Sequence, residues 1–305
     1  MKNVGTFFST DGKSNVYWTE WVPEGEIKGI VQIVHGMAEY VDRYAGLAEY
    51  LNQYGILVAG NDHIGHGHSA DEKDYGYFGK KGGWNYLIED VEELRKILAD
   101  KYPGVPYVIL GHSMGSFITR NYLSRHGGKG LSGAIIEGTA GPNPALGAGM
   151  ALAKFIRSFS GPRYKSWLIQ MLAFGSYAKG IEGAKTTYDW LTRDDAVVQE
   201  YIEDDRCGFT FTLSGFIDLF TLLKNIDTDE WYQSFPKSLP AFFIAGSKDP
   251  VGACGEGPTY VANKLKDLGC KTELKIYEGM RHELHNEIGK EEVYEDIKNF
   301  VESVY

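Results

Sequence analysis

The side chain best suited to nucleophilic chemistry is that of Ser113, in the segment Gly-His-Ser-Met-Gly at 111–115. An apolar run at 107–110 precedes this segment, and a helix-compatible stretch at 116–125 follows it. A strand that passes into a helix through Gly-x-Ser-x-Gly places the serine on a tight, strained turn, because a Cβ at either glycine would collide with neighbouring backbone. The hydroxyl then lies near the positive end of the helix that follows. The pattern predicts a serine nucleophile for acyl transfer.

A serine hydroxyl needs a general base, and the base needs a carboxylate that orients it. Two later segments provide both, in the order Ser, Asp, His that accompanies this kind of turn. Asp249 follows the apolar run 241–245, and His282 follows the run 272–277. Because α/β enzymes gather their chemistry at the carboxyl ends of parallel strands, we predict a catalytic triad of Ser113, Asp249 and His282.

Acyl transfer also needs N–H donors for the oxyanion that develops on the substrate. One predicted donor is the backbone N–H of Met114, the residue after the nucleophile. The other is the N–H of Met37, which follows the apolar run 30–34 and Gly36, a residue that lets the backbone approach the substrate closely. Both roles are backbone roles, and the two methionine side chains are equally compatible with ordinary packing.

Each member of the predicted triad has a competing interpretation. Ser113 is also a normal residue at the start of a helix, where its side chain would cap the first turn. Asp249 precedes a proline and is therefore compatible with a simple turn, in which case Glu256 is the nearest other carboxylate. His285 competes with His282, because it lies one helical turn further along.

Two groups of histidines suggest a metal site instead. The run 282–285 resembles the zinc signature His-Glu-x-x-His, but Asn286 stands where the second histidine would be, so that interpretation fails. The second group lies in a glycine-rich setting whose spacing matches no metal motif, which favours a loop packed beside the active site. Its members are His35, Asp62, His63, His66 and His68. We predict no metal and no cofactor.

Three motifs of this chain resemble those of one enzyme family. They are His-Gly-Met-Ala-Glu-Tyr at 35–40 with Arg-Tyr at 43–44, Asp-His-Ile-Gly-His-Gly-His-Ser at 62–69, and Gly-His-Ser-Met-Gly at 111–115. In this order and rough spacing they resemble the monoglyceride lipase and lysophospholipase branch of the α/β-hydrolase superfamily. Ser116 departs from that branch, which usually has a further glycine there, and the difference bears on helix packing rather than on the chemistry.

The resemblance covers the chain on both sides of a middle region and is much weaker inside it. It implies an esterase or lipase acting on a single-chain acyl ester, with catalytic positions that fall on Ser113, Asp249 and His282. These are the residues already selected for their chemistry.

The rest of the chain predicts an α/β fold. Apolar runs alternate with amphipathic helices, which is typical of a mostly parallel central sheet covered by helices on both faces. An N-terminal hairpin is expected around Asp11-Gly12. The predicted strands are 30–34, 56–61, 107–110, 133–138, 241–245 and 272–277, and the predicted helices are 44–54, 84–102, 116–125, 258–268 and one that spans 293–304.

The region 140–235 interrupts this alternation. It opens with Gly-Pro-Asn-Pro at 141–144 and then reads as several helices rich in aromatic and aliphatic side chains. We predict a core made of 1–139 and 236–305, with 140–235 inserted as a helical cap over the serine. The apolar side chains of the cap would either pack its own small core or line a hydrophobic acyl pocket. Its glycines would allow the cap to open.

The chain has 305 residues, enough for one large α/β domain with an insertion, and a formal net charge of −10. This charge argues against nucleic acid or an anionic membrane as a bulk electrostatic partner. No run approaches the roughly 18 apolar residues of a membrane helix. The chain starts without an apolar signal region, and its three cysteines (Cys207, Cys254 and Cys270) are widely spaced, so we expect a cytoplasmic protein. The oligomeric state is left open.

These features together predict a serine carboxylic-ester hydrolase that acts on small or single-chain acyl esters through an acyl-enzyme intermediate. The first alternative is a serine aminopeptidase or amidase, for which Glu137, Glu182, Asp204 and Asp205 would form an acidic pocket for the substrate amine. Less favoured are a metal-dependent hydrolase and a non-catalytic receptor on the same fold.

Overall fold

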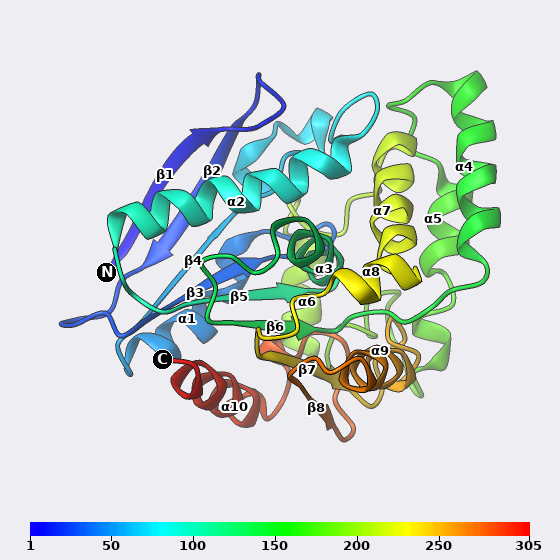
Figure 1. The fold of residues 1–305 in the computed structure, drawn as a ribbon. Helices are drawn as coiled ribbons and strands as arrows, with labels where there is room; N and C mark the ends of the chain where they lie inside the picture. The colour runs from blue at the N-terminus through cyan, green and yellow to red at the C-terminus, as the bar shows by residue number, and fades with distance from the viewer.

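A single sheet forms the centre of the structure, a computed structural model that describes residues 1–305. The strands are β1 (Lys2–Phe8), β2 (Asn15–Trp21), β3 (Gly29–Val34), β4 (Ile56–Asn61), β5 (Tyr107–His112), β6 (Gly133–Glu137), β7 (Ala241–Gly246) and β8 (Thr272–Tyr277). Their order across the sheet is β1-β2-β4-β3-β5-β6-β7-β8 (Figure 1). β2 is antiparallel to both of its neighbours, and every other neighbouring pair is parallel.

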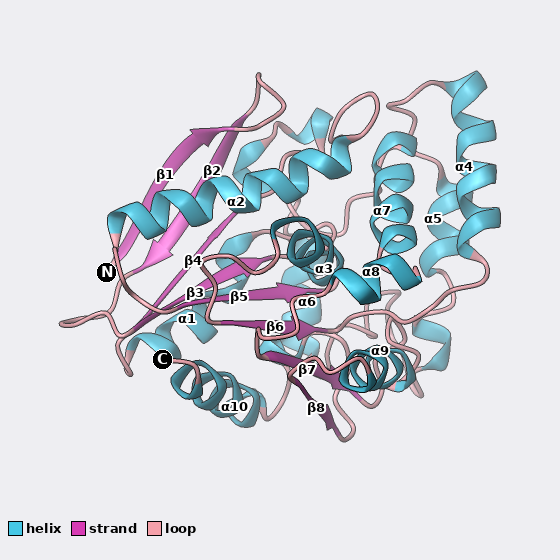
Figure 2. Ribbon diagram, in the orientation of Figure 1, coloured by secondary structure: helices cyan, strands magenta, loops and turns pink.

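From β3 onward, helices connect successive strands. The α-helices are α1 (Ala45–Asn52), α2 (Gly83–Lys101), α3 (Met114–His126), α4 (Leu146–Ser160), α5 (Trp167–Phe174), α6 (Asp195–Glu203), α7 (Leu213–Asn225), α8 (Asp229–Ser234), α9 (Glu256–Asp267) and α10 (Lys290–Ser303). Short 3-10 turns are η1 (Val41–Tyr44), η2 (Gly67–Ser69), η3 (Glu72–Asp74), η4 (Ala178–Gly180) and η5 (Leu284–Asn286). Figure 2 shows the strands as a continuous inner layer with helices outside it. None of the helices has both the length and the apolar character that crossing a membrane requires.

The predicted fold class is confirmed, because a mostly parallel sheet carries helices on both faces. Alternate residues of the central strands point to opposite sides, as the period of a β-strand requires. Ile109 and Ile136 belong to one core cluster together with residues of α2, α3 and α9. Val108 and Ile135 belong to a second cluster together with residues of α1 and α10. Strands that are buried on both faces read as continuous apolar runs, which explains why they were visible in the sequence.

Element boundaries differ from the predictions in small ways. The N-terminal hairpin is confirmed, with Phe8 paired to Asn15 at its closed end. The helix predicted at 258–268 begins earlier, at Glu256, because a proline is tolerated within the first turn of a helix. The helix predicted at 44–54 is preceded by a separate 3-10 turn, η1, and ends at Asn52.

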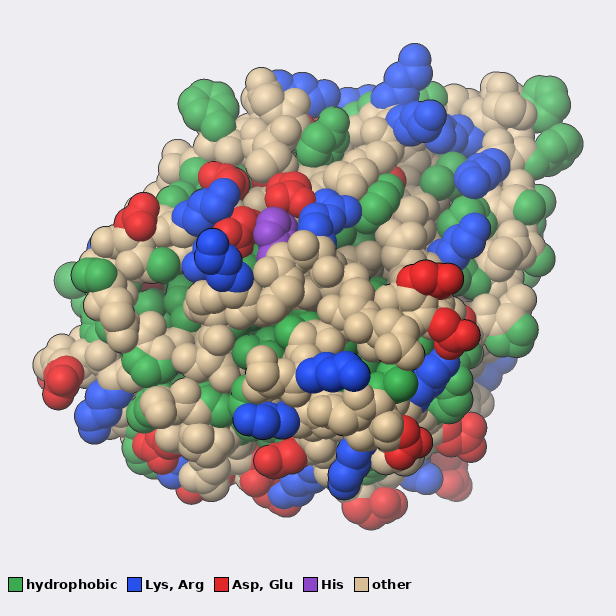
Figure 3. Space-filling view, in the orientation of Figure 1, with side chains coloured by type: hydrophobic (Ala, Val, Ile, Leu, Met, Phe, Trp, Pro, Cys, Tyr) green, Lys and Arg blue, Asp and Glu red, His purple; other side chains and the backbone are tan.

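The helices α4 to α8 follow β6 and precede β7, and Figure 1 shows α4, α5 and α7 side by side at one end of the sheet. Their apolar side chains divide into two groups. Those of α7, such as Phe216, are buried in the main core cluster. Several on α4 and α5 point outward instead: Phe159 is 79% exposed and Trp167 is 71% exposed. Figure 3 shows apolar side chains along the edge where these helices lie. These exposed side chains of α4 and α5 therefore do not pack a core of the region, which was one of the two alternatives considered for them.

Candidate active site

Ser113 occupies the turn between β5 and α3, as the Gly-x-Ser-x-Gly pattern predicted. Its backbone has φ 53° and ψ −121°, a conformation that L-residues rarely adopt. The turn is held by the Ser113 N–H, which donates to the Glu137 carbonyl at 3.0 Å, and by the Ser116 hydroxyl, which donates to the Ser113 carbonyl at 2.6 Å. The Ser113 side chain makes no helix-capping hydrogen bond, so the interpretation of this serine as a simple cap is wrong. The half-buried hydroxyl is free for other chemistry.

Close packing of the serine turn against β3 requires glycine at position 115. A Cβ added to Gly115 would lie 1.8 Å from the carbonyl oxygen of Val34, far inside van der Waals contact with rigid backbone. This approach brings the start of α3 against the end of β3. The chain that leaves β3 therefore passes directly beside the serine: a Cβ on Gly36 would lie 3.1 Å from the Cβ of Ser113.

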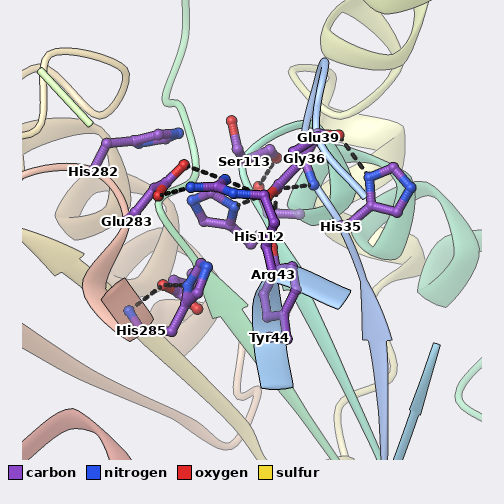
Figure 4. Close-up of polar contacts among 12 residues, drawn as sticks. His35, Gly36, Glu39, Arg43, Tyr44, His112, Ser113, His282, Glu283 and His285 are labelled. Atoms are coloured by element: carbon purple, nitrogen blue, oxygen red, sulfur yellow. Dashed lines mark hydrogen bonds and ion pairs between the residues drawn. The ribbon is translucent and has the colours of Figure 1, made fainter. Parts of the chain in front are cut away.

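Asp249 and His282 come together from the loops after β7 and β8. Nδ1 of His282 lies 2.9 Å from Oδ1 of Asp249, and both side chains are buried. The distance is that of an ion pair, although the angle is outside hydrogen-bond geometry, since neither nitrogen of His282 has a hydrogen-bond partner. Oδ1 of Asp249 also accepts the Val251 N–H at 2.9 Å, which fixes the carboxylate. Figure 4 shows the imidazole of His282 extending toward Ser113.

Two opposing effects act on the His282 imidazole. Burial favours its neutral form and alone would lower the pKa, but the negative charge of Asp249 beside Nδ1 outweighs this effect. The pKa of His282 therefore lies above the ordinary value of 6.5. A base of this kind is strong enough to take a proton and able to stabilise the cation that results.

Both predicted oxyanion donors lie at the strand ends around Ser113. Met114 is the first residue of α3, so its N–H is among those that a helix leaves without an intrahelical acceptor. Met37 follows Gly36 in the loop after β3, and its N–H takes part in none of the backbone hydrogen bonds of the loops. Two unengaged N–H groups near one serine are what a developing oxyanion needs.

The competing candidates for the acid and the base lie elsewhere. Glu256 begins α9 and is exposed, and the carboxylate paired with His282 is that of Asp249. His285 is fully buried, and its Nδ1 lies 2.8 Å from Oε1 of Glu137. Glu137 is thus committed to His285 inside the core. The acidic pocket considered for a substrate amine therefore loses this residue.

Of the other three carboxylates considered for a pocket that binds a substrate amine, one is paired with other side chains and two are exposed. Asp204 accepts hydrogen bonds from Arg206 and from the Tyr40 hydroxyl at 2.8 and 2.7 Å. Glu182 and Asp205 are exposed and carry no ion pair. Two of the four carboxylates, those of Glu137 and Asp204, are therefore already paired with other side chains.

The histidine cluster after β3 and β4 is packed as a core. The rings of His35 and His63 lie 4.0 Å apart, and the His63 N–H donates to Nε2 of His35 at 3.0 Å. Burial lowers the pKa of His63 to about 4 and that of His66 to about 3, so both are neutral at physiological pH. His68 pairs with Asp62, whose carboxylate also accepts the Val41 N–H at 2.9 Å.

The side chains whose metal-type ligand atoms converge within 4.8 Å are different ones, Glu39, His112 and His285. Oε1 of Glu39 already accepts three hydrogen bonds, and Nδ1 of His285 faces Glu137. These ligand atoms are therefore already occupied by hydrogen bonds within the protein.

Sequence reasoning gave no role to several residues that touch this site. Trp190, from the segment between β6 and β7, lies with its ring 5.0 Å from that of His282, and its carbonyl accepts the His282 N–H at 3.3 Å. Glu39, Arg43 and Glu283 form a buried ion-pair chain beneath the site. Glu39 and Arg43 stand in a motif that carried the family resemblance, and this was the one available signal.

Comparisons with known proteins identify relatives of this chain. A family model described as "Serine aminopeptidase, S33" matches residues 25–289. The monoacylglycerol lipase of Mycolicibacterium smegmatis is 28% identical, over 97% of this chain and 96% of the relative. The monoglyceride lipase of Homo sapiens is 28% identical, over 88% of this chain and 80% of the relative. A thermostable carboxyl esterase from Bacillus coagulans, solved in complex with glycerol, superposes with a TM-score of 0.93 at 35% identity, over 99% of this chain and 98% of the other.

The family match spans most of the sheet, the serine turn and the loops that carry Asp249 and His282. The structural match extends over the middle region as well, because it covers nearly the whole chain. This chain therefore belongs to the serine aminopeptidase S33 family of α/β-hydrolases.

Proposed function

We propose that this protein is a serine hydrolase that cleaves single-chain acyl esters, such as monoacylglycerols or lysophospholipids, with Ser113 as nucleophile. The observation that carries the proposal is the pairing of His282 with Asp249 at 2.9 Å at the same sheet edge as the strained serine turn. The relatives named above as monoacylglycerol lipases and a carboxyl esterase support ester hydrolysis.

The reaction runs in two halves. Ser113 Oγ transfers its proton to Nε2 of His282 and forms a bond to the ester carbonyl carbon, while Asp249 stabilises the imidazolium. The N–H groups of Met37 and Met114 hold the oxyanion. The bond to the leaving alcohol breaks, and the alcohol takes the proton from His282. Water then attacks the acyl-enzyme, His282 again moves the proton, and the acid is released with Ser113 restored.

Residues 140–235 are proposed as a cap over this reaction centre. Support comes from the position of this region between β6 and β7 and from the contact of Trp190 with His282. A largely apolar covering would suit an acyl chain and would exclude water from the oxyanion. The three cysteines are free, which is compatible with the proposed cytoplasmic location.

The experiment is labelling of the purified protein with a fluorophosphonate probe, followed by a substrate panel. We expect labelling at Ser113, and Ser113→Ala should lose the label and lower turnover by a factor on the order of 10⁴ or more. The panel contains p-nitrophenyl esters of increasing chain length, monoacylglycerols, lysophospholipids and aminoacyl anilides. Preference for the anilides would establish the aminopeptidase alternative, and a metal chelator should change nothing. Unimpaired turnover by Ser113→Ala would refute the proposal.

A further inference from the structure

Beneath the proposed reaction centre lies a chain of buried polar side chains that the mechanism does not use. Glu39, Tyr44, His112 and Glu283 are all at most 2% exposed. Figure 4 shows them between the Ser113 turn, the loop after β3 and the His282 loop. Burying charged groups costs free energy, and apolar replacements of the same shape are often as stable, so stability alone does not account for such a chain.

Glu39 is the centre of this chain. Its Oε1 accepts the Gly36 N–H at 2.5 Å, Nδ1–H of His112 at 3.0 Å and the Tyr44 hydroxyl at 3.0 Å. Gly36 immediately precedes Met37, the proposed oxyanion donor, and His112 immediately precedes Ser113. One carboxylate oxygen thus ties the oxyanion loop to the nucleophile turn.

The chain continues to the base through Arg43. Its Nη1 donates to Oε2 of Glu39 at 2.9 Å, and its two terminal nitrogens donate to the two oxygens of Glu283 at 2.7 Å each. Glu283 immediately follows His282, and its own N–H donates to the Leu191 carbonyl at 2.7 Å. A bidentate pair of this kind fixes orientation as well as distance.

The ionised form of Glu39 is favoured by the groups around it. Burial alone would raise the pKa of the Glu39 carboxyl, but the hydrogen bond from His112 and the charge of Arg43 hold this pKa well below its ordinary range. The Glu39 carboxylate is therefore ionised at neutral pH and can accept all four of these hydrogen bonds.

We propose that Glu39 is a positioning residue of the reaction, which holds the oxyanion loop in register with the Ser113 turn and, through Arg43 and Glu283, with the His282 loop. The proposal rests on the proposed function. Its physical basis is that an oxyanion donor acts only at 2.7–3.1 Å from the charge, so that a shift of about 1 Å in the loop costs on the order of 10²-fold in rate.

The direct test is Glu39→Gln, which keeps the shape but replaces one acceptor oxygen by an amide group that can only donate. Either the three donors to Oε1 (Gly36, Tyr44 and His112) or the donor to Oε2 (Arg43) then faces an amide nitrogen. We expect kcat on a soluble p-nitrophenyl ester to fall about 100-fold while KM stays within about threefold, because the loss is in the transition state. The rate of fluorophosphonate labelling should fall in parallel.

Glu92→Gln is the matched control. Glu92 binds Arg95 through two bonds of 2.7 Å and accepts the Tyr122 hydroxyl at 2.6 Å, a similar but less deeply buried arrangement between α2 and α3. This variant should also lower thermal stability but leave kcat and KM near wild type. A Glu39→Gln enzyme that retains kcat within about threefold, or that loses activity only as far as Glu92→Gln does, overturns the proposal.

A third variant covers the case in which Glu39→Gln does not fold. Tyr44→Phe removes a single hydrogen bond to Glu39 and no charge. We expect kcat to fall several-fold with KM unchanged, and an unchanged kcat in a folded Tyr44→Phe enzyme would then overturn the proposal. Labelling of the wild-type protein separates this outcome from failure of the proposed function, because a wild type that does not label contradicts the latter.

Discussion

The strained backbone of Ser113 predicts that glycine at this position makes the protein more stable while removing its activity. With φ 53° and ψ −121°, the residue lies where an L-side chain costs about 1–3 kcal/mol, whereas glycine adopts the conformation freely. The surrounding bonds, from the Ser113 N–H to Glu137 and from Ser116 to the Ser113 carbonyl, hold the backbone there whichever side chain is present.

The magnitude follows from two opposing contributions. Relief of strain contributes about 1–3 kcal/mol, and the greater entropy of glycine in the unfolded chain removes about 0.4–1 kcal/mol. The net gain is about 1–2 kcal/mol. An unfolding entropy of roughly 2 cal/mol/K per residue over 305 residues amounts to about 0.6 kcal/mol/K, so Tm should rise by about 2–3 °C.

The reference for this comparison is Ser113→Ala rather than the wild type. Alanine removes the same hydroxyl but keeps the Cβ, so both variants lack the nucleophile and differ only in backbone freedom. Scanning calorimetry and urea unfolding of the two variants measure the difference. Equal stability, or a less stable Ser113→Gly, would refute the argument that the turn is strained.

Because the pKa of His282 is raised and the base must be neutral to act, kcat/KM should fall as pH drops through a value above 6.5, and a profile that stays flat down to pH 6 contradicts this. Burial lowers the pKa of His66 to about 3, so as pH falls this imidazole is protonated in the unfolded chain before it is protonated in the folded protein, and the wild type loses stability. The free energy of unfolding of His66→Phe should therefore rise by about 1 kcal/mol relative to that of the wild type between pH 6.5 and pH 5.5. Urea unfolding at both pH values measures this change, and a difference that is the same at both would contradict the prediction. Gly115→Ala should yield no folded, active enzyme, because its Cβ would lie 1.8 Å from the Val34 carbonyl oxygen. The control Gly147→Ala, in helix α4 with no atom within 4 Å of the added Cβ, should fold and increase the free energy of unfolding by about 0.5–1 kcal/mol. Normal activity of Gly115→Ala would contradict the packing argument.

The elements that carry chemistry could be predicted because their local sequence and their burial demand the same structure. β5 and β6 are buried on both faces and so read as apolar runs, and each ends at a glycine or polar residue where the chemistry begins. Ser113 and Asp249 each follow such a run, whereas His282 follows β8, an edge strand that is only partly buried. The geometric order of parallel strands then places their ends at one edge, although no local pattern specifies the distance between them.

The middle region was harder because burial there depends on partners that no local pattern reveals. Phe216 and Phe159 both lie on amphipathic helices, yet the first is fully buried and the second is 79% exposed. Periodicity identifies an apolar helix face but not what covers it. The same limit explains Glu137, which resembled a pocket residue until the fold placed His285 against it.

The Glu39 chain shows why chemistry and support differ in how well they can be predicted. A nucleophile must stand in a turn whose residues are adjacent in sequence, so Ser113 carries its own signature. Glu39, in contrast, accepts hydrogen bonds from Gly36, which lies three residues away in the sequence, and from His112, which lies 73 residues away. It is connected to the His282 loop only through Arg43, which binds Glu283. Each of these residues alone has an ordinary surface interpretation. Buried together they cost free energy, as does the strained serine, and both costs fall at the same sheet edge. Several destabilising features at one place in a structure are expected where the geometry is needed for the reaction rather than for the fold.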